Sequence, residues 1–392
     1  MEEMKELFYR DPYCRTFEAQ VLSCEKGKHG WDVVLDDTAF YPEGGGQPAD
    51  HGTLGGAAVQ DVHRRDGVIV HETDRPLPVG ETVQGTIDWT RRFDHMQQHS
   101  GEHIVSGLIH RKFGWDNVGF HLGETVVIDF NGPLTWEDAL TVEAEANAVI
   151  YDNRETVITC PSKEELAALP YRSKKELTGT VRIVEFPGAD LCACCGTHVA
   201  RTGEIGAVKI LSLMHHRGGV RLEMLCGRRA MARLDAVYDD DSTAARSLSV
   251  PAGETAAAVE KEKGELAALK QRLGAVQQKY FRLLAAQLPQ EGLAVAVERD
   301  LSPWELRKGA EALAESGKAA AYLLLAGEGE TRDYILISAS QDVRPLGRAL
   351  NERLHGRGGG RDAVQGRFSA PEEEILRTAA ELAPQYLRKD QP

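Results

Sequence analysis

The sequence contains no long hydrophobic run, no export signal, no disulfide-like cysteine pattern and no excess of positive charge. No stretch approaches the roughly 20 apolar residues of a membrane-spanning helix, so no membrane partner is expected. The N-terminus, Met1-Glu-Glu-Met-Lys-Glu, is acidic and lacks the basic-then-apolar pattern of a signal peptide. The seven cysteines, three of them crowded between positions 192 and 195, do not resemble a disulfide framework. These absences predict a protein of the reducing cytoplasm.

The charge balance is acidic. With 46 Lys and Arg residues against 60 Asp and Glu residues, the formal net charge is −14, which argues against a general nucleic-acid coat. A local basic surface remains compatible with this balance. The 392 residues, 42% of them apolar and 27% charged, are enough for two or three soluble domains.

The first 90 residues alternate short β-type runs with turn signals, a pattern typical of a small β-barrel. The predicted strands are Phe17–Leu22, Trp31–Leu35, Ala58–Val62, Gly67–His71 and Val83–Ile87. An irregular insertion, Phe40-Tyr-Pro-Glu-Gly-Gly-Gly-Gln-Pro-Ala-Asp-His-Gly52, interrupts them. Its consecutive glycines allow the backbone to approach another surface closely, such as a nucleotide end, although a plain turn is the commoner use.

Two pairs of metal-type ligands stand about a hundred residues apart: His99-Ser-Gly-Glu-His103 and Cys194-Cys-Gly-Thr-His198. Histidines at positions i and i+4 project from one side of a helix, and the apolar residues that follow His103 have helical spacing. The second pair lies between a β-type run and a turn-rich segment, which predicts a loop. Three imidazoles and one thiolate suit Zn²⁺ better than calcium or magnesium. We therefore predict one zinc site, clamped between a helix and a loop.

Other interpretations of these ligands remain open. Each pair alone is compatible with a solvated helix face or a small buried thiol, and the zinc can be structural rather than catalytic. Cys192 or Cys195 can replace Cys194 as the thiolate ligand. A protease-type HExxH helix fits poorly, because Glu102 directly precedes His103 and points about 100° away from it.

The C-terminal part begins with a seven-residue apolar rhythm from Val259 to Leu283, which predicts a short coiled coil or a helix packed on its own chain. An α/β pattern follows, with strands at Leu293–Val297, Ala320–Leu325 and Asp333–Ser338 and a helix at Pro303–Ser316. Residues 354–368 combine glycines with arginines. Such a loop can hold phosphates through N–H groups and guanidinium groups, or be a solvated turn.

The order of these motifs resembles that of the alanyl-tRNA editing proteins, freestanding relatives of the editing domain of alanyl-tRNA synthetase, in a long form with an added C-terminal domain. The resemblance extends almost end to end. It is carried by the glycine-rich insertion, the HxxxH helix, the CxxxH loop and the segments Gly203–Gly206 and Arg217–Glu223. Residues Gly358–Gly366 resemble the glycine-rich signature of the DHHA1 domain. The sequence departs from the family pattern at Cys195, where a glycine is usual.

The resemblance implies an α+β fold with a β-barrel at 1–90, an α/β zinc-containing editing core at 91–240, a helical or coiled-coil arm at 241–290 and an α/β DHHA1-like domain at 291–392. It implies an aminoacyl-tRNA hydrolase, a carboxylic ester hydrolase that deacylates mischarged alanine tRNA. Ser-tRNA is the expected substrate, with Gly-tRNA a second. A full alanyl-tRNA synthetase is not expected, because the chain starts directly with the barrel.

The same resemblance implies roles for individual residues. The metal ligands carry over as His99, His103, Cys194 and His198. Gln98 and Glu102 are weak candidates for activating water, and Glu102 is as well explained as a solvated helix residue. The predicted substrate and tRNA contacts lie in glycine-rich or basic turns: Gly44, Gly45, Gly46, Gln47, Arg217, Arg221, Arg357 and Arg361, with Arg228, Arg229 and Arg367 beside them.

Three alternatives are kept. The chain can be a noncatalytic tRNA-binding or dimerisation protein with structural zinc, a metal hydrolase for small esters or peptides, or an editing enzyme for mischarged threonine tRNA. The threonine system shares both ligand motifs but usually carries proline where this chain has Thr197, which favours the alanine system. The C-terminal region makes a homodimer plausible.

Overall fold

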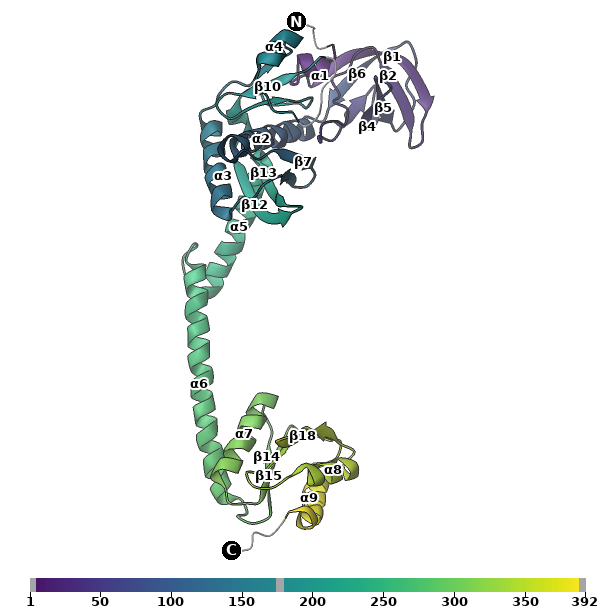
Figure 1. Cartoon of the computed structure of the whole chain (residues 1–392). Helices are drawn as coiled ribbons and strands as arrows, with labels where there is room; N and C mark the ends of the chain where they lie inside the picture. Colours follow the sequence, from purple (N-terminus) through teal and green to yellow (C-terminus); the bar gives the residue numbers. More distant parts are fainter. Residues whose placement is uncertain (1–4, 174–179, 388–392) are drawn as a thin grey trace. The chain divides into compact units, whose positions relative to one another are not determined.

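The computed structural model describes residues 5–173 and 180–387 and divides into two compact units, Met1–Thr243 and Ala244–Pro392 (Figure 1). The division falls inside helix α5 (Gly227–Leu248). Both units mix helices with strands, which confirms the predicted α+β class. The domain boundaries predicted at 90/91, 240/241 and 290/291 stay predictions.

A closed six-stranded barrel follows the short helix α1 (Leu7–Arg10) and confirms the predicted small barrel. Its strands lie in the order β1-β2-β5-β4-β3-β6. Their bounds are β1 Thr16–Lys26, β2 Trp31–Leu35, β3 Gly52–Leu54, β4 Ala57–Arg65, β5 Val68–Thr73 and β6 Thr82–Ile87. Strand β6 alternates strictly between exposed and buried residues, as expected when one face packs into a core. Strand β3, which begins at the last residue of the glycine-rich insertion, was not predicted.

Helix α2 (Trp89–Phe113) runs through the interior of the first unit and carries both predicted histidines. Asp88 caps its start by accepting a hydrogen bond from the Arg91 N–H, and Gly114, at a φ of 76°, ends it in the left-handed region. Two glycines that weaken its helix propensity have a packing role. A Cβ at Gly101 would overlap the Cys226 sulfur, and one at Gly107 would overlap the backbone at Ala189.

Two antiparallel sheets and several short helices surround α2. The larger sheet has the order β12-β13-β8-β7 and the smaller one β11-β10-β9. The strand bounds are β7 Asn117–Leu122, β8 Val126–Phe130, β9 Val157–Thr159, β10 Ile183–Phe186, β11 Asp190–Ala193, β12 Val208–His216 and β13 Gly219–Cys226. The helices are α3 Trp136–Tyr151, α4 Lys163–Ala168 and the 3-10 helix η1 Thr202–Ile205. Helix α2 contacts α3, η1, β7, β8, β11 and β13, so its side chains reach both sheets.

A buried ion pair joins the barrel to α2. Arg92 donates to both carboxylate oxygens of Asp50, and neither side chain is exposed to solvent. Arg92 also donates to the backbone oxygens of Pro12 and Ala39. Because removing one partner of a buried ion pair leaves an uncompensated charge, the barrel and α2 depend on each other for stability.

The second unit is a five-stranded sheet covered by helices. The strand order is β14-β15-β16-β18-β17, with β14 and β15 parallel and the other neighbours antiparallel. The strands are β14 Leu293–Glu298, β15 Ala321–Ala326, β16 Arg332–Ile337, β17 Arg357–Gly359 and β18 Ala363–Phe368. The helices are α6 Thr255–Gln287, α7 Pro303–Ser316, α8 Arg344–Arg353 and α9 Glu372–Tyr386. The loop predicted at 354–368 is mostly a β-hairpin, because β18 pairs with β16 and β17 pairs with β18.

Helix α6 carries an exposed apolar stripe along its length. We call this the α6 stripe: Val259, Leu266, Leu269, Leu273, Val276, Tyr280 and Leu283, each between 40% and 69% exposed. Near its C-terminal end the helix packs on α7, with Phe281 and Ala285 buried. The helix is as predicted, while the coiled coil stays a prediction, since the described residues of the second unit leave the stripe uncovered.

Within residues 5–173 and 180–387, no helix combines the length and apolar character needed to cross a membrane.

Candidate metal centre

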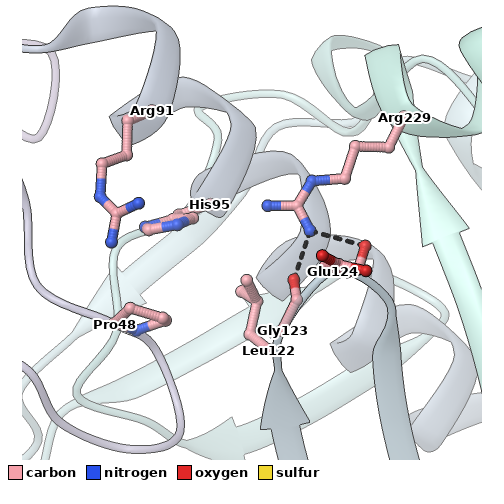
Figure 2. Close-up of a pocket in the computed structure, with 7 residues that line it drawn as sticks. All are labelled: Pro48, Arg91, His95, Leu122, Gly123, Glu124 and Arg229. Carbon is pink, nitrogen blue, oxygen red and sulfur yellow. Dashed lines mark hydrogen bonds between the residues drawn. The ribbon is translucent and has the colours of Figure 1, made fainter.

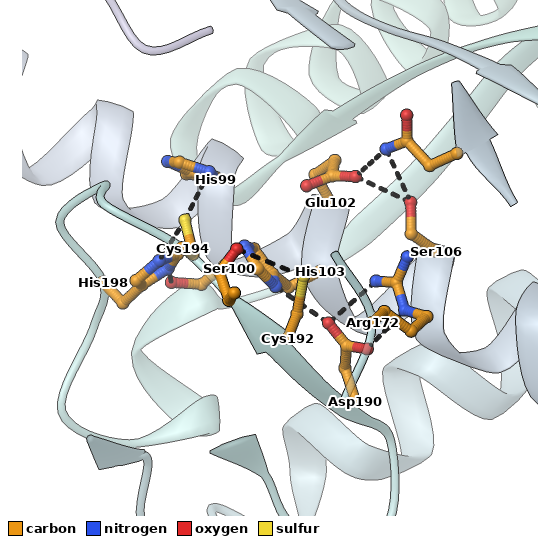
Figure 3. A network of polar contacts seen from close by, with 12 residues as sticks. His99, Ser100, Glu102, His103, Ser106, Arg172, Asp190, Cys192, Cys194 and His198 are labelled. Carbon is orange, nitrogen blue, oxygen red and sulfur yellow. Dashed lines mark hydrogen bonds and ion pairs between the residues drawn. The ribbon is translucent and has the colours of Figure 1, made fainter. Parts of the chain in front are cut away.

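The structure brings the four predicted ligands together at the middle of α2 (Figure 3). His99 and His103 lie one turn apart on the helix, and Cys194 and His198 lie on the loop after β11. The Cys194 sulfur is 3.5 Å from His99 Nε2 and 3.4 Å from His198 Nε2. A tetrahedral zinc ion with ordinary bond lengths would separate sulfur and nitrogen ligands by about 3.6 Å. Both sulfur–nitrogen distances match this value, and all four donor atoms lie within 4.8 Å of one another.

Each histidine is held by a hydrogen bond at its other ring nitrogen. His99 Nδ1 lies 2.9 Å from Gln47 Oε1, and His103 Nδ1 lies 2.8 Å from Asp190 Oδ2. Because an amide or carboxylate oxygen accepts, both Nδ1 atoms carry hydrogen and leave Nε2 to face the metal position.

The remaining supports complete this outer layer. His198 Nδ1 lies 3.3 Å from Ser100 Oγ, and Arg172 holds Asp190 in place with hydrogen bonds of 2.8 and 2.9 Å. In Figure 3, Asp190 lies between His103 and Arg172. Such second-layer contacts orient ligands and raise their basicity.

The site favours a thiolate. Burial alone would raise the pKa of Cys194, but the nearby imidazoles, His99 and His103 foremost, lower it well below its ordinary value. Burial lowers the pKa of His198 to about 3, so this imidazole is neutral. For His103, the opposing effects of the Cys194 thiolate and Asp190 exceed that of burial and raise the pKa to about 10. A metal ion would replace this proton, since metal ligands bind in their deprotonated forms.

The neighbouring cysteines differ from Cys194. Cys192 is buried, and burial followed by the charge of Asp190 raises its pKa, so it stays a thiol. Cys195 is exposed as a whole residue, but its thiol is largely buried. This burial, followed by the charge of Cys194, raises the pKa of the Cys195 thiol. Cys192 forms a second close group with His103 and Asp190, but the group with three imidazoles contains Cys194.

The glycine-rich insertion contributes a tight turn that touches the metal centre. Gly45 and Gly46 have φ values of 59° and 84°, and reciprocal backbone hydrogen bonds join Gly44 to Gln47. A Cβ at Gly46 would overlap Phe120. The turn therefore delivers the fully buried Gln47 side chain to His99 and Thr197. The predicted substrate contacts of these four residues are untested, and the structure gives Gln47 a positioning role.

The two predicted catalytic residues have structural partners instead. Gln98 makes two 2.8 Å hydrogen bonds with the backbone of Cys226. Glu102 is buried and accepts hydrogen bonds from Ser106 and Asn117, and Figure 3 shows its carboxylate directed towards Ser106 rather than towards the ligands. The solvated position considered for Glu102 is wrong, because the side chain is 2% exposed. These contacts favour structural roles for both residues.

The predicted tRNA-contacting arginines divide into two groups. Arg217 and Arg357 are exposed, and Arg361 is 94% exposed at the tip of the β17-β18 hairpin. Arg228 is exposed as well, and Arg361 has a 3.9 Å ion pair with the adjacent, exposed Asp362. The remaining three form closer ion pairs: Arg221 with Asp129, Arg229 with Asp94 and Arg367 with Asp333.

Asp190, Ser100 and Arg172 were not predicted as site residues. Asp190 lies 87 positions from His103, the residue that it orients, and no spacing rule connects them. Ser100 follows His99 directly, so its position inside the HxxxH segment was the one available signal. Arg172 precedes Asp190 by 18 residues and carries no motif.

Two family descriptions match parts of the chain. Residues 181–223 match "Threonyl and Alanyl tRNA synthetase second additional domain", and residues 12–91 match "tRNA synthetases class II (A)". The first match covers the CxxxH loop and the strands that follow it. The second covers the barrel and the start of α2.

Curated relatives match nearly the whole chain. The alanyl-tRNA editing protein AlaX-L of Pyrococcus horikoshii is 30% identical over 98% of this chain and 100% of its own length. The alanyl-tRNA editing protein Aarsd1 of Mus musculus is 29% identical over 95% of both chains. The alanine–tRNA ligase of Ignicoccus hospitalis is 36% identical over 62% of this chain but only 28% of the ligase.

Proposed function

This chain belongs to the family of alanyl-tRNA editing proteins, and from this premise we propose that it hydrolyses the ester of mischarged alanine tRNA. Serine is the expected amino acid and glycine the second, and the products are free amino acid and intact tRNA. The observation that carries the proposal is the buried set of four ligand atoms, three of them oriented by Gln47, Asp190 and Ser100.

Zinc is the proposed ion, because three imidazoles and a thiolate at tetrahedral spacing suit its ligand preferences. His99, His103, Cys194 and His198 would hold it. When bound, zinc supplies positive charge that polarises a nearby ester carbonyl. Four protein ligands leave no open position in an ordinary tetrahedral site, so we favour an ion that positions the substrate.

The burial of the four ligand residues indicates from which side an aminoacyl ester reaches the metal centre. The three histidines are at most 3% exposed, whereas Cys194 is partly exposed. Cys194 is the one ligand residue of the four that is not fully buried, so we place the approach of an ester on its side. In the reaction, water adds to the ester carbonyl carbon, the bond to the ribose oxygen breaks, and a proton passes to that oxygen. An ester is already activated, so placing water and substrate together provides most of what the reaction needs.

Selectivity requires a polar contact to the serine hydroxyl, since apolar pockets reject an added hydroxyl poorly. The segment from Thr38 to Gln47 contains polar side chains that we compare for this role. Thr38 lies inside the barrel, 2.8 Å from His71 Nε2. Gln47 and its hydrogen-bonded partner Thr197 are the polar side chains of this region that reach the metal centre. They are the better candidates for reading the hydroxyl.

The tRNA contacts that we propose are the exposed arginines Arg217, Arg357 and Arg361, whose guanidinium groups suit phosphate oxygens. Arg221 is retained as a weaker candidate because it is paired with Asp129. We further propose a homodimer formed through the C-terminal region and a cytoplasmic location.

Amino-acid release from Ser-tRNA, Gly-tRNA and Ala-tRNA, all on the alanine tRNA, tests the function. We expect rapid release of serine, release of glycine, and sparing of alanine. His103→Ala should abolish release and lower the zinc content. His110→Ala is the matched control, because His110 lies on the same helix with a 42% exposed side chain.

Two results would contradict the proposal. Release from none of the charged tRNAs would leave a binding protein with structural zinc. Faster release of serine from the threonine tRNA than from the alanine tRNA would point to threonine editing.

A further inference from the structure

A second polar site lies beside the metal centre, in an open pocket of about 460 Å³ (Figure 2). Its lining comes from four places: the residue after Gln47, the first turns of α2, the end of β7 with the following turn, and the start of α5. The lining residues are Pro48, Arg91, His95, Leu122, Gly123, Glu124 and Arg229. None of them was needed to build the metal centre.

His95 supplies a buried polar atom without a partner. The side chain is 2% exposed, and its Nδ1 has no hydrogen-bond partner within the described part of the chain. Leaving such an atom unpaired is unfavourable, so an unpaired ring nitrogen in a pocket wall points to a ligand. Figure 2 shows the ring between the guanidinium groups of Arg91 and Arg229.

The surroundings of His95 are positive. Burial, then Arg91, Arg229 and Arg92, lower the pKa of His95 to about 3, so the ring is neutral and has one N–H to donate. His51 adds to the same effect when it is protonated. A negatively charged ligand would be attracted by these groups and would accept that hydrogen.

Arg91 is the arginine of this pocket with spare donors. Arg229 is bound to Asp94 and to backbone oxygens of Gly123 and Glu124. Arg91 donates from Nε to the Ala49 oxygen at 3.0 Å, and within residues 5–173 and 180–387 it forms no ion pair. Its terminal nitrogens therefore remain for an anion. The one carboxylate among the lining residues belongs to Glu124, which is exposed to solvent, where its repulsion is screened.

The pocket adjoins the metal centre along three elements. His95 precedes His99 by four residues of α2, a rise of about 6 Å. Pro48 follows Gln47, which binds His99, and Leu122 lies two residues after Phe120, whose ring stacks on His99. A ligand that fills the pocket is thus next to the atoms that would hold the ester.

We propose that this pocket binds a phosphodiester at the 3′ end of the RNA, adjacent to the terminal ribose that carries the amino acid. The inference rests on the proposed function. Phosphate oxygens match both kinds of donor here, the arginine fork and the neutral imidazole N–H. The site positions the RNA end and takes no part in breaking the ester.

Two substrates with the same ester separate this role from a structural one: Ser-tRNA, and 3′-O-seryl-adenosine, which has no phosphate. Arg91→Gln should lower kcat/KM for Ser-tRNA about ten- to a hundredfold, as expected for one charge-assisted hydrogen bond. The rate with seryl-adenosine should stay within about twofold. Arg91→Lys should recover part of the loss. Arg111→Gln is the matched control, an exposed arginine near the other end of α2.

Direct binding provides a test that does not depend on hydrolysis. The Kd of uncharged alanine tRNA should rise in Arg91→Gln, and the slope of log Kd against log salt should fall by roughly 0.7. A wild type that releases no serine would refute the proposed function but not the inference. The Kd of uncharged tRNA would still decide whether the pocket binds the RNA. An equal loss with both esters, or an unchanged Kd, would overturn the inference. Binding of inorganic phosphate that depends on Arg91, with unchanged tRNA affinity, would assign the pocket to free phosphate and overturn it as well.

Discussion

The metal centre and the α6 stripe meet opposite structural demands. In the centre, the three histidines are at most 3% exposed. Each of them has a hydrogen-bond partner at its second ring nitrogen. Along the stripe, apolar side chains are between 40% and 69% exposed, and nothing in the described second unit covers them. The first region is complete within one chain. The second has a surface that would gain stability from burial.

Replacing the thiolate ligand should greatly weaken metal binding at the centre. Cys194→Ala removes one of four donors and leaves the imidazoles without the charge that balances a cation. We expect zinc affinity to fall by more than about 100-fold, beyond the usual loss for an outer-layer residue, and serine release to disappear. Zinc content and release from Ser-tRNA measure the two effects. Cys195→Ala is the control, and an equal zinc loss there would contradict the assignment of Cys194.

Removing an outer-layer contact should have a smaller effect on the same centre. In Gln47→Ala, His99 Nδ1 loses its acceptor and the ring loses its fixed orientation. Zinc affinity or serine release should fall about 10- to 100-fold. Zinc titration with a competing chelator measures the change. Gln60→Ala, at an exposed position of the barrel, should behave as wild type; an unaffected Gln47→Ala would show that the ligands are held without this layer.

Acid should destabilise the barrel through His71, which is buried inside it. Burial lowers the pKa of His71 to about 4, from an ordinary value of 6.5. The unfolded chain therefore binds the extra proton between these values, and stability is lost as pH falls from about 6.5 to about 4. The contribution of this group is about 3 kcal/mol. Denaturant unfolding of wild type and His71→Gln at several pH values should give a shallower decline for the variant.

The exposed His29→Gln is the control for this acid effect. It should keep the wild-type decline, since its side chain is in solvent in both states. Parallel pH curves for the wild type and His71→Gln would refute the assignment.

Charges on the α6 stripe should change assembly and leave catalysis per chain nearly unchanged. Leu266→Lys with Leu273→Lys places two charges on the stripe, while Gln271→Lys with Gln278→Lys places the same charges on the opposite face of the helix. We expect the first pair to raise the dimer Kd at least about tenfold and the second to leave it unchanged. Sedimentation over a concentration series measures both. A wild type that is monomeric throughout would remove the dimer proposal.

The periodic parts of the fold were predictable from the sequence. The alternation of β-type runs identified five of the six barrel strands, and the helix at Pro303–Ser316 has the predicted bounds. Strand β3 was missed because its three residues, Gly52–Leu54, are too few to show the alternation of apolar and polar residues that marks a strand, and glycines follow them. The hairpin at residues 354–368 was missed because its pairing with β16 is long-range and its glycine content indicates a loop.

The site was predictable where ligands are paired in sequence. Spacing identified His99 with His103 and Cys194 with His198, since each pair is four residues apart. The outer layer was not predictable, because Asp190 and Gln47 reach the histidines across 87 and 52 residues. Glu102 is a different case: its place inside the HxxxH segment suggested chemistry, which stays a prediction, while the structure shows its carboxylate accepting a hydrogen bond from Ser106.

The ion pair between Asp50 and Arg92 also sets an order of events during synthesis. The two residues are 42 positions apart, so at about 5–20 residues per second the ribosome adds Arg92 roughly 2–8 s after Asp50. Until then a nascent barrel would have to bury a carboxylate without its cation. The 95 residues from His99 to Cys194 add a further wait of roughly 5–19 s before a thiolate can join the histidines. The spacing therefore sets a lower limit on two events: the buried ion pair cannot form before Arg92 is made, and the four-ligand set is not complete before Cys194 and His198 are made.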